Sequence, residues 1–193
     1  MAITRIYEWA HHHPDRTAIV WNGRAVSYAR FARGIEAARQ ILGALNLPIG
    51  STAVLLVRSL LESWTVSLAL RSLGLNTVAV TSTESAQALG ISHVSCLIAC
   101  QDMLQQGAVK SMPWSGARLI QIPADSYRTP AREGAPALPE GMPRPGGHIL
   151  YTSGTTGIYK KLFLDGEQMT LRNEALATDD VLDYSAAWQT SFL

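Results

Sequence analysis

The sequence lacks the features that would tie it to nucleic acid, to a membrane or to an export pathway. Its 16 Lys and Arg nearly balance its 15 Asp and Glu, giving a formal net charge of +1, so no long-range field attracts a polyanion. No apolar run approaches the ~20 residues that a membrane span requires. The N-terminus has neither the apolar core nor the small-residue cleavage site of a signal peptide. We therefore expect a folded cytoplasmic protein with no nucleic-acid partner and no membrane span.

Cysteine is also scarce, and its placement argues against a structural disulfide. Cys96 and Cys100 are the only two, and in an extended segment they lie roughly 13 Å apart, which is too far for a bridge. Two thiols without further ligands make no zinc site. The consecutive histidines at 11–13 would point in different directions on a helix and could not share one ion. We predict two reduced, buried cysteines and no metal site.

Two local patterns indicate how the fold begins. Residues 17–21 and 24–28 are β-rich runs on either side of Asn22-Gly23, the dipeptide best suited to a type I′ turn because both central residues need positive φ. Together they predict a β-hairpin. From 28 to 45 apolar residues recur at three- and four-residue steps, which predicts an amphipathic helix with Ser27 as its N-cap.

Beyond this helix, apolar runs of strand length alternate with helical segments. Residues 52–57 form a continuous apolar run. Ser59 then caps a predicted buried helix over 60–73, and a β-branched run follows at 77–80. Strand, helix and strand in this order predict a parallel crossover. The same alternation continues with a helix near 85–89, an apolar run over 93–100, a helix over 101–106 and a strand over 118–122. The prediction is an α/β fold with a mainly parallel sheet and helices on both faces.

Proline and glycine concentrate in one segment of the chain. Residues 123–147 hold six of the nine prolines and four of the 15 glycines, which is typical of a linker or a long surface loop. This segment separates an N-terminal α/β subdomain, residues 1–122, from residues 148–193. In that last part we predict the start of a second sheet, a helix from about 167 to 177 and a strand near 181–184.

The residues with the most specific chemistry follow the strand predicted at 148–152. The run Ser153-Gly154-Thr155-Thr156-Gly157 combines hydroxyl donors with glycines that let backbone amides converge. Lys160 and Lys161 add one or two compact positive charges behind it, and such a cradle suits a nucleoside triphosphate. On composition alone, a hairpin loop with two solvated lysines is the alternative. The P-loop and dinucleotide-binding fingerprints are both absent.

The run Tyr151-Thr-Ser-Gly-Thr-Thr-Gly157, with Lys160 after it, resembles the phosphate loop of the adenylate-forming superfamily. That superfamily contains acyl-CoA synthetases, aryl-CoA ligases and the adenylation domains of peptide synthetases. Two positions depart from its pattern: Tyr159 stands where the family has proline, and Lys161 where it has glycine. Loss of the proline relaxes the backbone before Lys160. Upstream segments that resemble the start of these enzymes, in the same order, are 13–19, the hairpin, 27–28, 70–74 and 77–80.

The resemblance implies an ATP-dependent acyl-activating ligase, of which this chain is part of the large domain. A carboxylate attacks the α-phosphate of ATP, giving an acyl-adenylate and pyrophosphate, and the thiol of CoA or of a carrier protein then displaces AMP. With Mg²⁺ nearby, the implied ATP phosphate contacts are Thr152, Ser153, Gly154, Thr155, Thr156, Gly157 and Lys160. The family's adenine, ribose and metal motifs and its catalytic lysine have no match in this sequence. The resemblance therefore implies an N-terminal fragment without catalytic residues, inactive by itself.

A non-catalytic nucleotide-binding or interaction module on the same scaffold is the alternative function. In either case, a partial domain would leave uncovered the sheet edges and helix faces that the rest of a longer enzyme covers. Open edges and apolar patches favour association with another copy. The sequence therefore also predicts a homo-oligomer.

Overall fold

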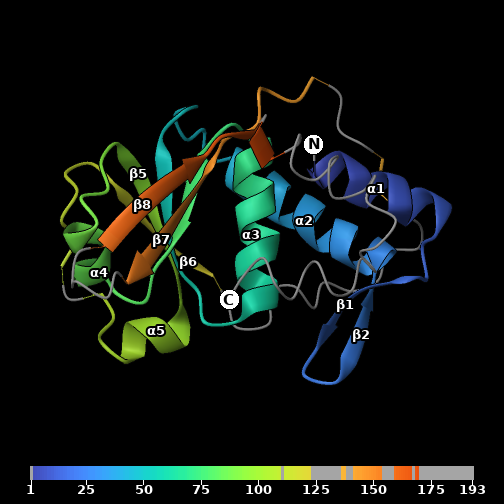
Figure 1. The fold of residues 1–193 in the computed structure, drawn as a ribbon, viewed down its shortest axis with the longest axis horizontal. Helices are drawn as coiled ribbons and strands as arrows, with labels where there is room; N and C mark the ends of the chain where they lie inside the picture. Colours follow the sequence, from blue (N-terminus) through green and yellow to red (C-terminus); the bar gives the residue numbers. More distant parts are fainter. Residues whose placement is uncertain are drawn as a thin grey trace.

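The computed structural model describes residues 2–109, 111–122, 136–137, 141–153, 159–166 and 168–169 (Figure 1). In chain order its elements are α1 (Ala2–His12), β1 (Thr17–Trp21), β2 (Arg24–Ser27), α2 (Tyr28–Gly43), β3 (Thr52–Leu56), α3 (Leu60–Ser72), β4 (Asn76–Ala79), α4 (Thr83–Ala88), β5 (Val94–Cys100), α5 (Gln101–Gln105), β6 (Arg118–Ile122), β7 (His148–Ser153) and β8 (Tyr159–Leu164). The predicted fold class is confirmed: a mainly parallel sheet with helices on both faces, and an N-terminal hairpin.

The main sheet has six strands in the order β6-β5-β3-β4-β7-β8. All neighbouring pairs are parallel except β7 and β8, which form an antiparallel hairpin. Sequence analysis placed β7 at the start of a second sheet, and this is wrong for the described strands. β7 pairs with β4, where Thr77 lies opposite His148, so the Pro/Gly-rich segment connects two strands of one sheet. The helix and strand predicted over 167–177 and 181–184 lie outside the described residues, apart from 168 and 169.

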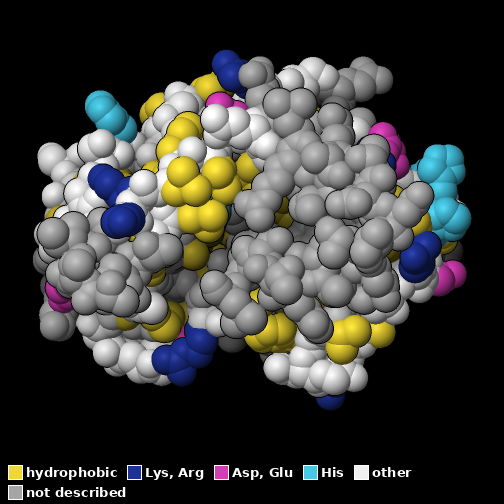
Figure 2. Space-filling model, in the orientation of Figure 1, with side chains coloured by type: hydrophobic (Ala, Val, Ile, Leu, Met, Phe, Trp, Pro, Cys, Tyr) yellow, Lys and Arg dark blue, Asp and Glu magenta, His cyan; other side chains and the backbone are white. Residues whose placement is uncertain are grey.

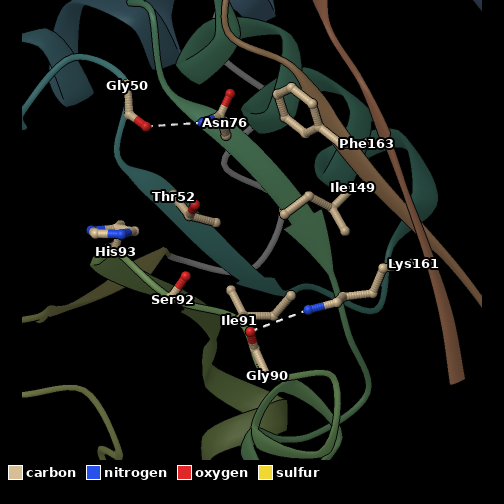
Figure 3. A pocket seen from close by; sticks show the side chains of 10 residues that line it. All are labelled: Gly50, Thr52, Asn76, Gly90, Ile91, Ser92, His93, Ile149, Lys161 and Phe163. Atoms are coloured by element: carbon tan, nitrogen blue, oxygen red, sulfur yellow. Dashed lines mark hydrogen bonds between the residues drawn. The ribbon is translucent and has the colours of Figure 1, made fainter.

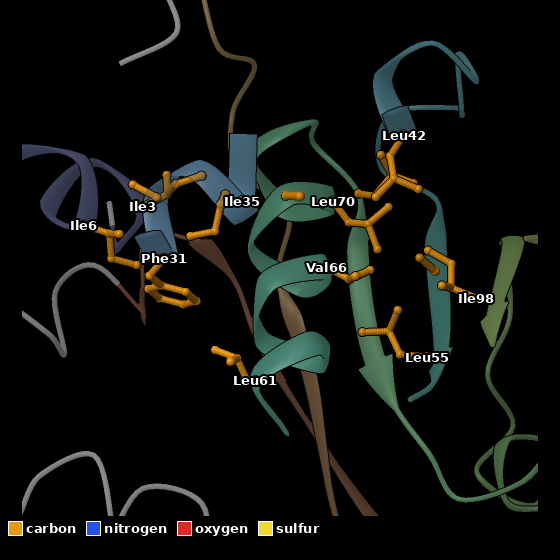
Figure 4. Packing of buried hydrophobic residues seen from close by; sticks show 14 of the residues in the cluster. Ile3, Ile6, Phe31, Ile35, Leu42, Leu55, Leu61, Val66, Leu70 and Ile98 are labelled. Atoms are coloured by element: carbon orange, nitrogen blue, oxygen red, sulfur yellow. The ribbon is translucent and has the colours of Figure 1, made fainter. Parts of the chain in front are cut away.

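The sheet separates two apolar cores. Helices α1, α2 and α3 lie on one side of it, and α4 and α5 on the other (Figure 1). Leu55 and Ile98 contribute to the first core (Figure 4), whereas Val54 and Leu97, their neighbours along the same strands, contribute to the second. Strands of a parallel sheet between two helix layers have no face toward solvent. This explains why β3 and β5 are read in the sequence as continuous apolar runs.

The hairpin and the start of α2 form as their local sequence predicts. Asn22 and Gly23 have φ of 50° and 71°, the two positive values that a type I′ turn requires. At the beginning of α2, the Ser27 side chain accepts a hydrogen bond from the backbone N–H of Arg30 at 3.4 Å. An N-cap of this kind satisfies one of the amides that a helix leaves without an internal partner.

Helix α1 was not among the predicted elements. Its buried residues are Ile3, Ile6, Tyr7 and Ala10, whose spacing is that of one helix face. They pack in the same core as Ile35 of α2 (Figure 4). The signal was therefore present in the sequence, in the part of the chain just before the three histidines.

Helix α3 occupies the centre of the molecule, between α2 and the sheet (Figure 1). It is buried on nearly all sides, as predicted, and even Arg71 is only 8% exposed. Such a helix shows little amphipathic periodicity, since it has almost no solvent face. Among the helices described, neither α3 nor any other combines the length and apolarity needed to cross a membrane.

We expect Ser59→Ala to lower the free energy of unfolding by about 1 kcal/mol. The Ser59 side chain accepts a hydrogen bond from the backbone N–H of Glu62 at 3.3 Å and so caps α3. Alanine leaves that amide without its cap, whereas Ser59→Asp keeps an acceptor and adds a negative charge at the helix N-terminus. Urea unfolding of the three proteins measures the difference. Equal stability of the alanine variant and the parent would show that the cap contributes nothing.

Candidate functional site

The strand that precedes the predicted phosphate loop, β7, ends at the carboxyl edge of the parallel strands. β7 runs parallel to β4 and ends at Ser153, which pairs with Tyr159 at the start of β8. Residues 154–158 connect the two strands. In open α/β sheets, ligands bind beyond the carboxyl ends of the strands. The strands on either side of the motif therefore meet at the edge of the sheet where ligand-binding loops are found.

The structure brings two of the seven predicted phosphate contacts next to each other. Thr152 of β7 and Lys160 of β8 are partners in the hairpin register, and Lys160 is exposed. Ser153 ends β7 one residue later. The four remaining positions, Gly154, Thr155, Thr156 and Gly157, lie outside the described residues. The site assignment as a whole stays a prediction.

The two adjacent lysines lie on opposite faces of the sheet, because successive side chains of a strand alternate. Lys161 is on the α4 side, where its Nζ donates a hydrogen bond to the carbonyl oxygen of Gly90 at 3.3 Å. The Lys160 side chain therefore lies on the opposite face of the sheet. Of the one or two charges expected at the mouth of the loop, Lys160 is the candidate, and Lys161 belongs to a different part of the surface.

A chain of hydrogen bonds, buried at Ser67 and Thr77, fixes the beginning of β7. The Nδ1 atom of His148 lies 2.8 Å from the Thr77 hydroxyl, which in turn lies 3.0 Å from the Ser67 hydroxyl of α3. Burial, together with the positive charge of Arg71, lowers the pKa of His148 to about 4. The imidazole is therefore neutral at pH 7, and we assign it a packing role.

Two glycines before β7 allow the chain to approach α3 and β4 closely. The N–H of Gly146 donates to the carbonyl oxygen of Arg71 at 2.9 Å, and the Arg71 Nε donates to the carbonyl oxygen of Gly146 at 3.1 Å. Next to it, the N–H of Gly147 donates to the Asn76 side chain at 2.8 Å. Burial lowers the pKa of Arg71 to about 10, so the guanidinium still carries its charge at pH 7. These contacts position the strand that carries the loop.

Arg58 is a further cation at this edge of the sheet. Arg58 follows β3, and its Nε lies 3.7 Å from the Asp102 carboxylate of α5. Its guanidinium also donates to the Gln106 side chain. Both members of the ion pair are about half exposed, so the pair adds little to stability.

Both cysteines are free and buried, as predicted. Burial raises the pKa of the Cys96 thiol to about 11 and also raises that of Cys100, whose Sγ donates to the Leu56 carbonyl oxygen. A thiol with a raised pKa is a poor nucleophile at neutral pH. The cysteines are therefore structural residues of the two cores.

Comparisons with known proteins identify the fold of this chain. No family model and no curated protein matches the chain. The N-terminal domain of FACL13 from Mycobacterium tuberculosis, solved with an inhibitor, matches with a TM-score of 0.62 and 22% identity, covering 86% of this chain and 44% of that one. This chain has the fold of the N-terminal domain of adenylate-forming enzymes. It spans less than half the length of that structure.

Two other structures of this group are similar. The O-succinylbenzoate coenzyme A synthetase of Bacillus subtilis, solved with ATP and magnesium, matches with a TM-score of 0.61 and 20% identity over 89% of this chain and 46% of that one. The NpsA N-terminal subdomain of Klebsiella oxytoca, solved with 3-hydroxybenzoyl-AMSN, matches with a TM-score of 0.58 and 21% identity, covering 83% of this chain and 40% of that one. At such identities the likeness concerns the fold.

Proposed function

We propose that this chain is the nucleotide-binding N-terminal part of an ATP-dependent acyl-activating ligase. One observation carries the proposal: the Ser-Gly-Thr-Thr-Gly run connects β7 to β8 at the carboxyl edge of the sheet, in a chain with the adenylate-forming fold. Composition alone left an ordinary hairpin loop as the alternative. The position at a ligand-binding edge, with Lys160 beside it, favours the phosphate cradle.

The proposed reaction proceeds by two displacements. A carboxylate oxygen attacks the α-phosphorus of ATP, the bond between the α-phosphorus and the bridging oxygen breaks, and pyrophosphate leaves with that oxygen. The thiol then gives up its proton to solvent, its sulfur attacks the acyl carbon, and AMP leaves with the electron pair of the broken C–O bond. Negative charge accumulates on the departing pyrophosphate in the first step. Fixed donors aimed at that charge lower the barrier.

The residues of this chain would hold the phosphates that leave. The hydroxyls of Thr152, Ser153, Thr155 and Thr156 are donors, and Gly154 and Gly157 lack the side chains that would keep amides away from an anion. Lys160 would add a positive charge. Mg²⁺ would enter on the phosphate oxygens of ATP, since it prefers oxygen ligands and keeps substrate phosphates among them. The loop thus orients the leaving group, while the acyl chemistry is assigned to residues outside this chain.

The acceptor thiol is proposed to belong to CoA or to a carrier protein. A coenzyme A synthetase and an artificially fused adenylation and carrier di-domain are both among the similar structures.

By themselves the 193 residues are expected to bind nucleotide weakly and not to turn over. The departures at Tyr159 and Lys161 favour the second candidate, a module that binds nucleotide without activating an acid.

Self-association also stays a prediction. Its support is that Leu162 and Phe163 of the edge strand β8 are 56% and 50% exposed.

Lys160→Ala and Thr155→Ala are each expected to weaken ATP binding by about tenfold, the loss that one charge-assisted hydrogen bond produces. Calorimetric titration of the chain with ATP and Mg²⁺ measures the affinity. Lys161→Ala is the matched control, because it removes the same charge from the opposite face of the same strand. Unchanged affinity in both loop variants would rule out the phosphate assignment. Equal losses in Lys160→Ala and Lys161→Ala would indicate an effect of net charge alone.

Pyrophosphate exchange separates the two candidate functions. The exchange is measured on the complete gene product with a panel of carboxylic acids. A ligase is expected to exchange pyrophosphate into ATP only when its acid is present. A binding module would hold ATP in the calorimeter and show no exchange with any acid. Absence of both binding and exchange in a folded protein would exclude both candidates.

A further inference from the structure

A groove of about 320 Å³ opens at the end of the sheet where the parallel strands β3 and β4 begin (Figure 3). Thr52 and Asn76, the first residues of β3 and β4, lie in its lining, together with the turn between α4 and β5 and residues of the β7–β8 hairpin. It faces the α4 side of the sheet. The volume lies within the usual range for sites that bind small molecules.

One side of the groove is apolar. Ile91, Ile149 and Phe163 form it, and Phe163 remains 50% exposed although it is aromatic. A Cβ added to Gly147 would lie 2.4 Å from the Phe163 ring, so the ring packs directly on the backbone of that glycine. Figure 2 shows apolar side chains gathered where Figure 1 places β7 and β8, with basic side chains close by. An exposed aromatic ring offers a surface for a flat apolar group.

The groove carries a cation and no carboxylate. Lys161 lies at one side, opposite His93 (Figure 3), and none of the ten lining residues is acidic. The Lys161 ammonium has three hydrogens, and its one described bond, to Gly90, uses one of them. Two donors therefore remain for a ligand. Ser92 adds a hydroxyl at the exposed turn.

Lys161 also stands at a position where the adenylate-forming pattern has glycine. Lys161 is the one lysine or arginine among the ten lining residues. A glycine at this position would therefore leave the groove without that positive charge. Lys160, one residue earlier, cannot replace it, because it lies on the other face of the sheet.

We propose that this groove binds a small organic carboxylate with a flat apolar body, the carboxylate on Lys161 and the apolar part against Phe163 and Ile149. The site is distinct from the predicted phosphate contact Lys160, since Lys161 and Phe163 point to the α4 side of the sheet and Lys160 to the other. It does not depend on the proposed ligase function.

Titration of the ¹⁵N-labelled chain with benzoate, followed by two-dimensional NMR, tests the proposal. Benzoate is expected to shift the amide signals of Gly90, Ile91, Ser92 and Phe163. Lys161→Ala should weaken the affinity by about fivefold, the upper range for an exposed ion pair, whereas Lys161→Arg and Lys160→Ala should retain it. Benzamide, which has the same shape without the charge, should bind less tightly than benzoate.

The variants distinguish the possible outcomes. Equal binding of benzoate and benzamide, or equal affinity of Lys161→Ala and the parent, would overturn the carboxylate assignment. Phe163→Leu keeps an apolar side chain of similar length and is expected to weaken binding by a smaller factor. If Lys160→Ala lowers benzoate affinity as much as Lys161→Ala, binding is nonspecific and the groove is not the site. Failure of ATP binding would leave these results unaffected.

Discussion

Gly146→Ala is expected to lower the free energy of unfolding by about 3 kcal/mol or more. A Cβ at this position would lie 1.7 Å from the carbonyl oxygen and 2.2 Å from the carbonyl carbon of Leu75. Those are backbone atoms next to β4, so no side-chain rotation can make room. Either the chain before β7 moves away from α3 or β4 shifts within the sheet. In both cases the hydrogen bonds between Gly146 and Arg71 are strained or lost.

The measurement is urea unfolding followed by circular dichroism, with Gly43→Ala as the control. Gly43 lies in α2, and a Cβ there would meet Leu73 at 3.5 Å, an ordinary contact. Alanine is favoured over glycine within helices by up to about 1 kcal/mol, so this variant should be as stable as the parent or more stable. Similar losses in both variants would show that the close approach at Gly146 is not what the structure indicates.

Gly146 also bears on the proposed nucleotide binding. β7 leads directly from this contact toward the predicted phosphate loop, so displacement of the chain at Gly146 would shift the strand that carries it. We therefore expect a Gly146→Ala protein that still folds to bind ATP less tightly, although the residue is far along the strand from the loop. Such a loss would arise from positioning, since the glycine has no side chain to contact the ligand.

Local patterns predicted the elements that depend on neighbouring residues. Asn22-Gly23 specifies its turn through two positive φ values, and Ser27 and Ser59 cap their helices within three residues of themselves. The apolar runs of β3 and β5 indicate burial on both faces. Each of these signals is contained in a window of a few residues, and so can be read before any tertiary contact is known.

What the sequence did not predict depends on contacts between distant segments. β7 joins the six-stranded sheet through contacts in which Asn76 and Thr77 hydrogen-bond to Gly147 and His148. No local pattern encodes a pairing across the Pro/Gly-rich segment. The groove likewise forms only when β8 lies beside the turn at Gly90. The opposite directions of Lys160 and Lys161 could have been predicted from strand alternation, once residue 160 was assigned to a strand.

Stability is expected to fall as the pH is lowered from 8 to 5, with about 2 kcal/mol of the loss due to His148. Burial and the nearby Arg71 lower its pKa in the folded protein from 6.5 to about 4. In the unfolded chain the imidazole takes up a proton as the pH falls below about 6.5, whereas the folded chain takes it up only near pH 4. The unfolded state therefore binds more protons between these values. The loss of stability due to His148 is therefore small above pH 6.5, grows as the pH falls below this value and levels off below about pH 4.

His148→Asn tests this assignment, since asparagine keeps a group that can hydrogen-bond to Thr77 but does not titrate. Urea unfolding at pH 5, 6, 7 and 8 should give a weaker dependence on pH for this variant, even if lost packing lowers its stability at every pH. His93→Asn is the control, because His93 is exposed and has a φ of 53°, a conformation that asparagine tolerates. It should keep the full dependence. The same slope in all three proteins would mean that His148 takes up its proton equally in the folded and unfolded chain, so that burial and the charge of Arg71 do not hold the ring neutral.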